Sequence, residues 1–419
     1  MKILLKEVSI TDVASPHNNT SKDLLIENGI IKTIAKSIQE PGATVLAIPE
    51  LHVSQGWVDF KSGLKDPGFD EGGGILAGLD AAAKGGFTHI GVLPSDEPTT
   101  DMRSGIEYKL RVASHHAVKI HPIGAISKGR KGQSLAEMAD MCEAGTRWFS
   151  DNRPLSMRLM VQALLYGKDL NARIAFPTYS KDYSHFTQVN EGKASTLTGL
   201  LGHPSFDEKI EVMKAIETAK YTGVHIHLTG ISALESLPLI ATAKKEGVPL
   251  SCDVHLMNLC CSQERVLDFD TRFKTKPVLR AEEDRLALVA ALKSGIIDAV
   301  VSDHQAVITD TKRVPFDEAE SGTLQFQTAY GALKKYSGLT DKELIELLSV
   351  RNRTTFGIQM NPVDAHSVAD LTLYQPNHSN TQAEEIPKEL SPFASSDLPG
   401  KIVGIIRGSQ LVLNESYFA

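Results

Sequence analysis

Several titratable side chains lie within or directly after short apolar runs of the sequence. Asp151 and Asp303 each end a run of this kind, and His227 lies within the run 224–228. Carboxylates and imidazoles transfer protons in many enzymes, and they are also common ligands of Zn²⁺. Whether these three side chains can act together depends on the fold that positions the runs.

The middle of the chain alternates between short apolar runs and stretches with helical periodicity. Helical patterns cover residues 206–221, 233–246 and 281–294. Strand–helix alternation over roughly 300 residues favours a parallel sheet, and a closed (β/α)8 barrel fits that length. A doubly wound open sheet is the competing fold, but no GxGxxG motif follows the first strands. We therefore predict a TIM-like α/β barrel over residues 54–364, with its chemistry at the C-terminal ends of the strands.

Both ends of the chain show short strand patterns joined by turns. Glu27-Asn28-Gly29 separates two apolar runs and is a hairpin signal. Strand-like patterns also cover residues 370–374 and 402–406. These patterns predict one small β-sandwich module formed by residues 1–53 together with 365–419.

The composition argues against several classes of partner. The chain has 419 residues, 42% of them hydrophobic, and a formal net charge of −7. This acidic balance disfavours nucleic acid or an anionic membrane as a main partner. No stretch of about 18 apolar residues occurs, so no transmembrane helix is expected, and the start lacks the apolar run of a signal peptide. The four cysteines show no CxxC spacing, which is typical of free thiols in a cytoplasmic protein.

Longer motifs occur at the predicted strand ends in a fixed order. They are residues 55–68 (QGWVDFKSGLKDPG), 81–88 (AAAKGGFT), 149–151 (FSD), 227–229 (HLT), 277–285 (PVLRAEEDR) and 302–304 (SDH). Each resembles a segment of the dihydroorotases, which are cyclic amidohydrolases of pyrimidine synthesis. The resemblance runs through most of the chain and implies an amidohydrolase barrel. Dihydropyrimidinases and allantoinases share parts of it, but they usually carry a carbamylated lysine where Asp151 lies.

The resemblance implies hydrolysis or closure of a cyclic amide with one or two Zn²⁺ ions, which supply hydroxide and polarise the carbonyl. In the family, two histidines of an HxH motif and an aspartate of the last strand hold one ion. Two histidines of later strands hold the other, and a carboxylate or carbamylated lysine bridges the pair. By this comparison, Asp151 matches the bridging position and His227 a ligand of the second ion. Asp303 matches a ligand of the first ion and the catalytic proton shuttle.

Other ligand positions of the family hold different residues here. The HxH histidines correspond to Lys61 and Gly63, two positions that share one face of a strand. A charged ammonium group cannot ligate zinc, and glycine has no side chain. A further histidine corresponds to Phe176, and the TPHH segment of the family corresponds to residues 255–258. The resemblance therefore leaves neither zinc site complete, and zinc is expected to be absent or substoichiometric.

The substrate-binding groups of the family are also altered. Lys65 stands where the family has the arginine that binds the dihydroorotate carboxylate, and it keeps the charge without the bidentate fork. Ser95 stands where the family has an asparagine. By resemblance, these two residues are the candidates for contact with a substrate.

Lys61 supplies a positive charge where the first zinc ion would lie in the family. Without that ion, Asp151 and Asp303 would be buried like charges, which is unfavourable. We predict that the Lys61 ammonium bonds to Asp303, Asp151 or both, in place of the metal.

Two interpretations of the surviving polar residues stay open. Asp151, His227 and Asp303 could hold a residual metal, or they could be inherited residues satisfied by hydrogen bonds or an ion pair. The second is favoured, because zinc usually needs three or four converging ligands. A metal site rebuilt in a new geometry would draw on further histidines, namely His225, His255 and His304.

The resemblance suggests a non-catalytic dihydroorotase homologue. Some members of the family have lost metal ligands and serve as structural partners of aspartate carbamoyltransferase, and the departures in this chain fit that role. The alternative is an active dihydroorotase that interconverts carbamoyl aspartate and dihydroorotate with a rebuilt zinc site. A third possibility is a barrel mouth that binds another metabolite. Barrels of the family are often homodimers, so a homodimer is expected by resemblance.

Overall fold

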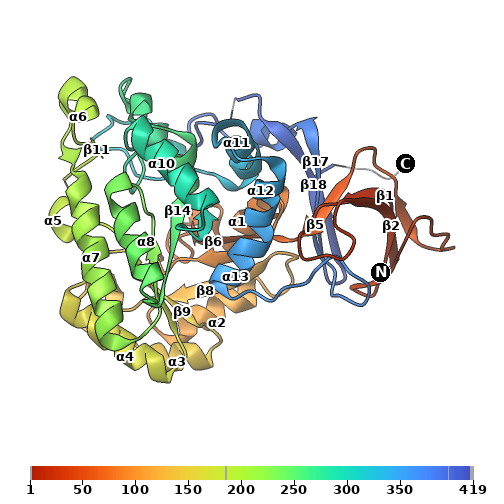
Figure 1. Cartoon of the computed structure of the whole chain (residues 1–419), viewed down its shortest axis with the longest axis horizontal. Coiled ribbons are helices and arrows are strands. Elements are labelled where there is room, and N and C mark those ends of the chain that lie inside the picture. The colour runs from red at the N-terminus through yellow and green to blue at the C-terminus, as the bar shows by residue number, and fades with distance from the viewer. Residues whose placement is uncertain (1, 185, 395, 416–419) are drawn as a thin grey trace.

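The computed structural model describes residues 2–184, 186–394 and 396–415. Short strands alternate with helices through the middle of the chain, and every pairing between these strands is parallel (Figure 1). The strands are β6 (Trp57–Gly63), β7 (Phe87–Val92), β8 (Lys119–Gly124), β9 (Trp148–Phe149), β10 (Arg173–Pro177), β13 (Ile226–Thr229), β14 (Leu250–His255), β15 (Ala299–Val301) and β16 (His304–Gln305). The predicted parallel sheet is confirmed.

The sheet closes on itself through an interrupted last strand. β15 pairs with β14, and β16 pairs with β6. Only Ser302 and Asp303 separate β15 from β16, and Asp303 has a left-handed φ of 52°. When β15 and β16 are counted as one strand, the nine segments of the sheet form a closed barrel of eight strands. This closure confirms the TIM-like fold.

Helices pack around the barrel strands (Figure 1). They are α1 (Gly74–Lys84), α2 (Arg103–Val112), α3 (Met138–Glu143), α4 (Met157–Asp169), α5 (Lys181–Ser184), α6 (Lys193–Thr198), α7 (Ser205–Thr222), α8 (Leu237–Lys245), α9 (Leu256–Cys260), α10 (Glu282–Lys293), α11 (Ala329–Tyr336), α12 (Asp341–Glu346) and α13 (Asn352–Phe356). Between α5 and α7, β11 (Val189–Asn190) and β12 (Gly202–His203) form a separate parallel pair.

The helix ends follow local sequence signals. α7 ends at Gly223, which has the left-handed conformation that glycine adopts readily. α10 begins with three acidic residues, which favour a helix N-terminus. α8 is shorter than the predicted 233–246, because residues 234–236 form a 3₁₀ turn and Pro238 suits the first turn of the helix that follows.

The barrel interior is apolar toward the N-terminal ends of the strands. Phe60 of β6, Trp148 of β9 and Phe356 at the end of α13 belong to one buried cluster. The rings of Phe60 and Phe356 stack with centroids 4.6 Å apart. α13 therefore plugs this end of the barrel with an aromatic side chain, and the titratable residues of the interior lie toward the other end.

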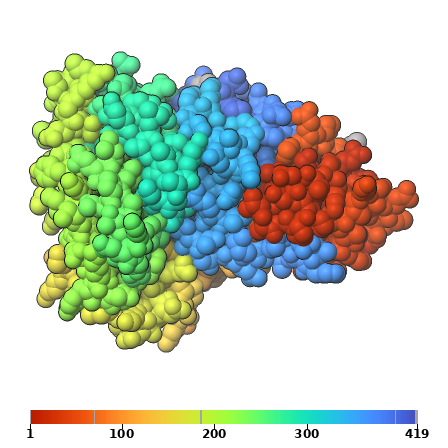
Figure 2. Space-filling view, in the orientation of Figure 1, coloured from red at the N-terminus to blue at the C-terminus, as the bar shows by residue number. Residues whose placement is uncertain are grey.

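Both termini contribute to a second sheet. It contains β1 (Lys2–Ile10), β2 (Thr20–Glu27), β3 (Ile30–Ala35), β4 (Thr44–Leu46), β5 (His52–Gln55), β17 (Asp370–Ser379), β18 (Pro399–Arg407) and β19 (Gln410–Leu413). The strand order is β19-β18-β17-β5-β1-β2-β3, with β4 beside β1, so the antiparallel pairing of β5 with β17 joins the two ends of the chain. The sheet surrounds an apolar core and projects from one side of the barrel (Figures 1 and 2).

A sheet built from both termini is thereby confirmed. The division of the chain into residues 1–53 plus 365–419 and residues 54–364 stays a proposal. In the part of the chain that the structure describes, no helix is long and apolar enough to cross a membrane.

Candidate active site at the barrel mouth

A cavity of about 670 Å³ opens at the C-terminal ends of the barrel strands. Its lining is rich in basic side chains from several loops, namely Arg130, Lys131, Arg153, Lys181 and Lys276. Asp303 is the one carboxylate among the described residues that line it. Burial lowers the pKa of the Lys276 ammonium, and the charges of Lys274 and Arg153 lower it further. This crowding of cations favours an anion in the mouth.

Lys61 lies buried at the base of the mouth, where β6 approaches its C-terminal end. Its Nζ is 2.9 Å from Nε2 of His255 and 3.9 Å from Oδ1 of Asp303. Nδ1 of His255 is 3.5 Å from Oδ2 of Asp303, so the three side chains form a closed cluster. Burial, aided by the Lys61 charge, lowers the pKa of His255 to about 4. The ring is therefore neutral near pH 7, and Nε2 accepts a hydrogen bond from the ammonium.

Gln305 fills the space beside Gly63. A Cβ atom built on Gly63 would lie 2.1 Å from Oε1 of Gln305. The same amide donates from Nε2 to Oδ1 of Asp303 at 3.0 Å. Gln305 therefore occupies the volume into which a side chain at position 63 would project, and it satisfies Asp303 from that side.

Asp151 is engaged by the loop that follows β8. Its Oδ1 accepts hydrogen bonds from the backbone N–H groups of Ile126 and Ser127, at 2.7 and 3.0 Å. Its Oδ2 accepts a hydrogen bond from the Ser127 hydroxyl. Burial raises the pKa of Asp151. Asp303 and Asp151 were the two predicted partners of Lys61. The described contacts of Lys61 include Asp303 but not Asp151.

Both ring nitrogens of His227 face protein partners. Nε2 lies 2.9 Å from Oδ2 of Asp253, and Nδ1 lies 2.8 Å from Oγ of Ser251. Burial alone would raise the pKa of Asp253, but the hydrogen bond with His227 and the nearby charge of Lys61 lower it to about 2. Asp253 thus remains a carboxylate and fixes the imidazole in place.

Asp59 forms hydrogen bonds at the break between β15 and β16. Its Oδ1 and Oδ2 accept hydrogen bonds from the backbone N–H and the hydroxyl of Ser302, at 2.5 and 2.9 Å. Burial raises the pKa of Asp59 to about 7. The carboxyl group thereby positions Ser302, and through it the neighbouring Asp303.

The other histidines named from the sequence do not converge with this cluster. His225 is exposed and lies just before β13, two residues before His227. His304 is buried against Phe326, with ring centroids 4.1 Å apart, and its Nδ1 accepts hydrogen bonds from the backbone of Gln325 and Phe326. Phe176 belongs to the main apolar core.

The two candidate substrate contacts lie beside the mouth. Lys65 forms an ion pair with Glu320. The hydroxyl of Ser95 is buried and has no hydrogen-bond partner within the described residues. Neither residue is among those that line the mouth cavity, so a role in substrate binding stays a prediction.

The side chains at the mouth do not fit a zinc ion. Within residues 2–184, 186–394 and 396–415, no group of three or more His, Cys, Asp or Glu side chains is arranged to hold a metal. Asp151 and His227 are held by protein donors and acceptors, and Asp303 faces the ammonium of Lys61 and the amide of Gln305. A dication in contact with Asp303 would meet the Lys61 charge at close range.

The sequence gives only weak signals that His255 and Gln305 belong to this site. His255 ends an apolar run, which is a signal for a strand end, but a lone histidine of this kind is more often structural. Gln305 carries no charge and follows the Ser302-Asp303-His304 motif by one position. Its role depends on the absence of a side chain at Gly63, which lies on another strand.

The chain that forms this site is similar in sequence to many dihydroorotases. A family model for dihydro-orotase-like proteins matches residues 52–236. A dihydroorotase from Thermoanaerobacter sp. (strain X514) is 34% identical over 383 residues, which cover 90% of this chain and 88% of the relative. A dihydroorotase from Acetivibrio thermocellus is 33% identical over 415 residues, which cover 96% and 97%.

Solved structures show the same fold at lower identity. The L-hydantoinase (dihydropyrimidinase) from Arthrobacter aurescens is similar with a TM-score of 0.82 and 18% identity, over 98% of this chain and 96% of that one. A D-hydantoinase is similar with a TM-score of 0.83 and 18% identity, over 99% and 96%.

Proposed function

Because the chain belongs to the dihydroorotase family, we propose that it is a non-catalytic member of that family, which acts by binding rather than by zinc-dependent hydrolysis. The observation that carries this proposal is the cluster of Lys61, His255 and Asp303. Lys61 supplies positive charge beside Asp303, and the Gln305 amide donates a hydrogen bond to it, where the family would have a metal.

The contacts of His255 and Asp303 also argue against a role for either side chain in activating a nucleophile. Near pH 7, the pKa shifts leave His255 neutral, with Nε2 directed at the Lys61 ammonium rather than at the cavity. Asp303 is 13% exposed and contacts both Lys61 and Gln305. The side chain that would act as proton shuttle in the family is therefore held in an ion pair and a hydrogen bond.

The resemblance to family members that have lost metal ligands supports a structural role beside aspartate carbamoyltransferase. We propose that this enzyme is the protein partner. The test is size-exclusion chromatography of the purified chain mixed with the carbamoyltransferase of the same organism. A peak containing both chains is expected, and separate elution at micromolar concentrations would contradict this part of the proposal.

Catalysis is tested directly with the purified protein. We expect no cyclisation of carbamoyl aspartate and no hydrolysis of dihydroorotate above background, with or without added Zn²⁺. Elemental analysis should find well under one zinc per chain. An authentic dihydroorotase assayed in parallel shows that the conditions support turnover.

The variant Asp303→Ala separates the two hypotheses. Turnover by the natural sequence that is lost in Asp303→Ala would overturn the non-catalytic proposal and favour an active dihydroorotase with a rebuilt zinc site. Trace turnover that is equal in both proteins indicates a contaminating enzyme and leaves the chain without measured activity of its own, as proposed.

A further inference from the structure

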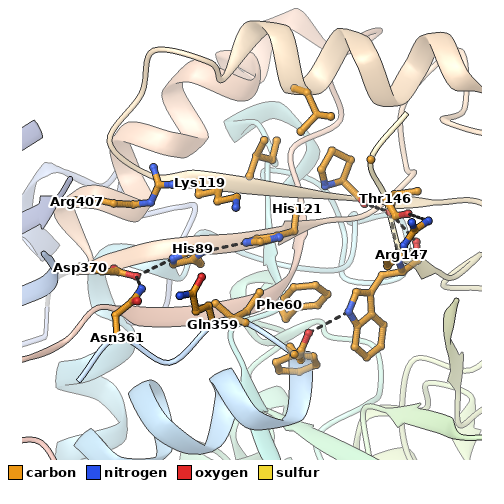
Figure 3. A pocket seen from close by; sticks show the side chains of 18 of the residues that line it. Phe60, His89, Lys119, His121, Thr146, Arg147, Gln359, Asn361, Asp370 and Arg407 are labelled. Atoms are coloured by element: carbon orange, nitrogen blue, oxygen red, sulfur yellow. Dashed lines mark hydrogen bonds and ion pairs between the residues drawn. The ribbon is translucent and has the colours of Figure 1, made fainter. Parts of the chain in front are cut away.

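A second cavity, of about 840 Å³, lies at the opposite end of the barrel from Asp303. The first residues of β8, β9 and β10 form one wall, and residues 356–361 form another. The turn between β18 and β19 of the terminal sheet completes it. We refer to this cavity as the basal cleft; Figure 3 shows it from close by. Its volume is in the range of small-molecule sites.

Four basic side chains line the basal cleft. Lys119 and Arg407 lie on one side of His121, and Arg147 lies on the other (Figure 3), while Arg173 also contributes to the lining. None of the four forms an ion pair with a carboxylate of the described residues, although the chain as a whole is acidic. Their positive charges are therefore not compensated by ion pairs within the protein.

Among the described residues, the three guanidinium groups donate their hydrogen bonds to backbone carbonyl oxygens, and Arg173 also lies over the Trp148 ring. Arg147 donates to the carbonyl of Cys142 at 3.2 Å. Arg173 donates to the carbonyl of Thr355 at 3.0 Å, and Arg407 donates to that of Ala117 at 3.4 Å. These bonds orient the groups and leave other guanidinium N–H donors for a ligand.

The one carboxylate in the lining, Asp370, is already neutralised. Its Oδ2 lies 2.7 Å from Nη2 of Arg353 and 2.9 Å from Nε2 of His89. Nδ1 of His89 in turn lies 2.9 Å from Nε2 of His121. Burial lowers the pKa of His121 well below its usual value, and His89 and Lys119 add to this effect. The Asp370 carboxylate is thus paired with Arg353 and His89 in the wall of the cleft, and its single charge is smaller than that of the four cations.

The cleft also has an aromatic wall. Phe60, Trp148 and Phe356 line it beside the basic groups. The Trp148 indole donates to the backbone carbonyl of Phe356 at 3.2 Å, so its orientation is fixed. Cations and ring faces together suit a ligand that has an anionic head and a planar or apolar body.

We propose that the basal cleft binds a phosphate-bearing small molecule, with the phosphate group beside Lys119 and Arg407 and the rest of the ligand toward the aromatic wall and Arg147. A phosphate group concentrates negative charge and offers several acceptors to arginine and lysine donors. The ligand would contact both the barrel and the terminal sheet. This site is independent of the barrel mouth, and it stands or falls separately from the proposed function.

Isothermal titration with inorganic phosphate, phenyl phosphate and succinate tests the assignment. We expect both phosphate compounds to bind and phenyl phosphate to bind more tightly, because its ring adds contacts with the aromatic wall. Succinate carries two carboxylates and serves as the comparison anion. Binding of succinate without binding of either phosphate compound would overturn the assignment of phosphate.

Matched variants locate the binding. Lys119→Gln removes charge beside the proposed phosphate position, and Arg147→Gln removes charge across the cleft. Lys209→Gln on α7 and Arg158→Gln on α4 are controls that line neither cavity. All four side chains are exposed, so the substitutions should leave the fold intact. Loss of one charge-assisted contact should weaken phosphate binding by about tenfold in Lys119→Gln, and the loss in Arg147→Gln should be smaller.

Lys209→Gln and Arg158→Gln should bind phosphate as the natural protein does. Binding that is unchanged in Lys119→Gln, or weakened as much in a control variant, would contradict the proposed location. Absence of phosphate and phenyl phosphate binding at millimolar concentration would overturn the proposal as a whole.

Discussion

Lys61 illustrates how one residue can change the electrostatics of a barrel. Its side chain is only 6% exposed, and burying an unpaired ammonium group is strongly unfavourable. Here the charge faces Asp303 and the neutral ring of His255. Each of these groups makes the burial of the others tolerable, so the cluster is expected to contribute to stability as a unit.

We expect Lys61→Met to destabilise the protein by about 2–3 kcal/mol, because it leaves Asp303 without its cation. The cost should be smaller in the double variant Lys61→Met/Asp303→Asn, which removes both charges. Urea unfolding measures both values. Lys128→Met is the matched control, since the exposed pair of Lys128 with Glu137 should contribute little to stability. Equal stability of Lys61→Met and Lys128→Met would show that the cluster is not coupled.

The raised pKa of Asp59 predicts that the stability of the fold decreases as the pH rises. Its pKa is about 7 in the folded protein, against a usual value of 3.8, because of its burial. Between these two values the folded state holds a proton that the unfolded chain has released, so stability falls as the pH rises. The variant Asp59→Asn has no such proton to lose.

Asp59→Asn should therefore gain stability relative to the natural protein by about 1.4 kcal/mol per pH unit between pH 5 and pH 7. Unfolding curves at several pH values measure this difference. Glu107→Gln, on an exposed helix pair, is the control and should show a flat difference. A flat difference for Asp59→Asn as well would mean that Asp59 is ionised throughout this range.

At the scale of elements, the last barrel strand is shaped by its two neighbours. It breaks at Ser302 and Asp303, where Asp59 of β6 accepts hydrogen bonds from the backbone N–H and the hydroxyl of Ser302. Beyond the break, β16 pairs with β6, and Gln305 extends over Gly63. The pairing of these strands therefore sets both the direction of Asp303 and the group that covers it.

Gly63→Ala should displace Gln305, because the new methyl group would overlap its amide oxygen. The Gln305 side chain is flexible, so we expect a modest loss of about 1–2 kcal/mol, corresponding to its hydrogen bond with the Asp303 carboxylate. In Gln305→Ala the same bond is already absent. Gly63→Ala should then cost almost nothing in the Gln305→Ala background, and additive costs in urea unfolding would refute the coupling.

The elements were largely predictable, and the contacts between them were not. Apolar runs followed by helical periodicity indicated the parallel barrel, and strand patterns at both ends indicated a shared sheet. The motif positions indicated that Lys61 and Asp303 would both lie at strand ends. The partnership of Lys61 with His255, however, depends on how strands far apart in sequence face one another, which local patterns do not encode.

At the scale of the whole molecule, a buried ion pair joins the barrel to the terminal sheet. Arg353 lies in α13 and has a fully buried side chain. It bonds to Asp370 at the start of β17 and to the carbonyl of Gly56, which lies between β5 and β6. His89 of β7 contacts the same carboxylate. One aspartate thus ties three separate parts of the chain together.

Asp370→Asn should lower the free energy of unfolding by about 3–5 kcal/mol, because it leaves Arg353 buried without its counter-charge. Differential scanning calorimetry and urea unfolding both measure this loss. Glu389→Gln removes one side of an exposed pair with Arg313 and should leave the free energy of unfolding nearly unchanged. A similar small cost for Asp370→Asn would show that the junction does not depend on this charge.

The basal cleft could not be predicted from the sequence for the same geometric reason. Lys119, Arg147 and Arg173 each lie at or just before the start of a barrel strand, where loops commonly carry exposed basic residues. Arg407 comes from the opposite end of the chain. Only the docking of the terminal sheet against the barrel brings these charges around one cavity.

Pairing of β5 with β17 also determines when the terminal sheet can be completed during synthesis on the ribosome. Val53 pairs with Leu373, so the N-terminal strands must wait until nearly the whole chain has been translated. The barrel strands lie between these two residues and can assemble first. Until β17 emerges, the apolar strands of the N-terminus expose an unpaired edge, which is a natural target for chaperones and a route to aggregation in truncated chains.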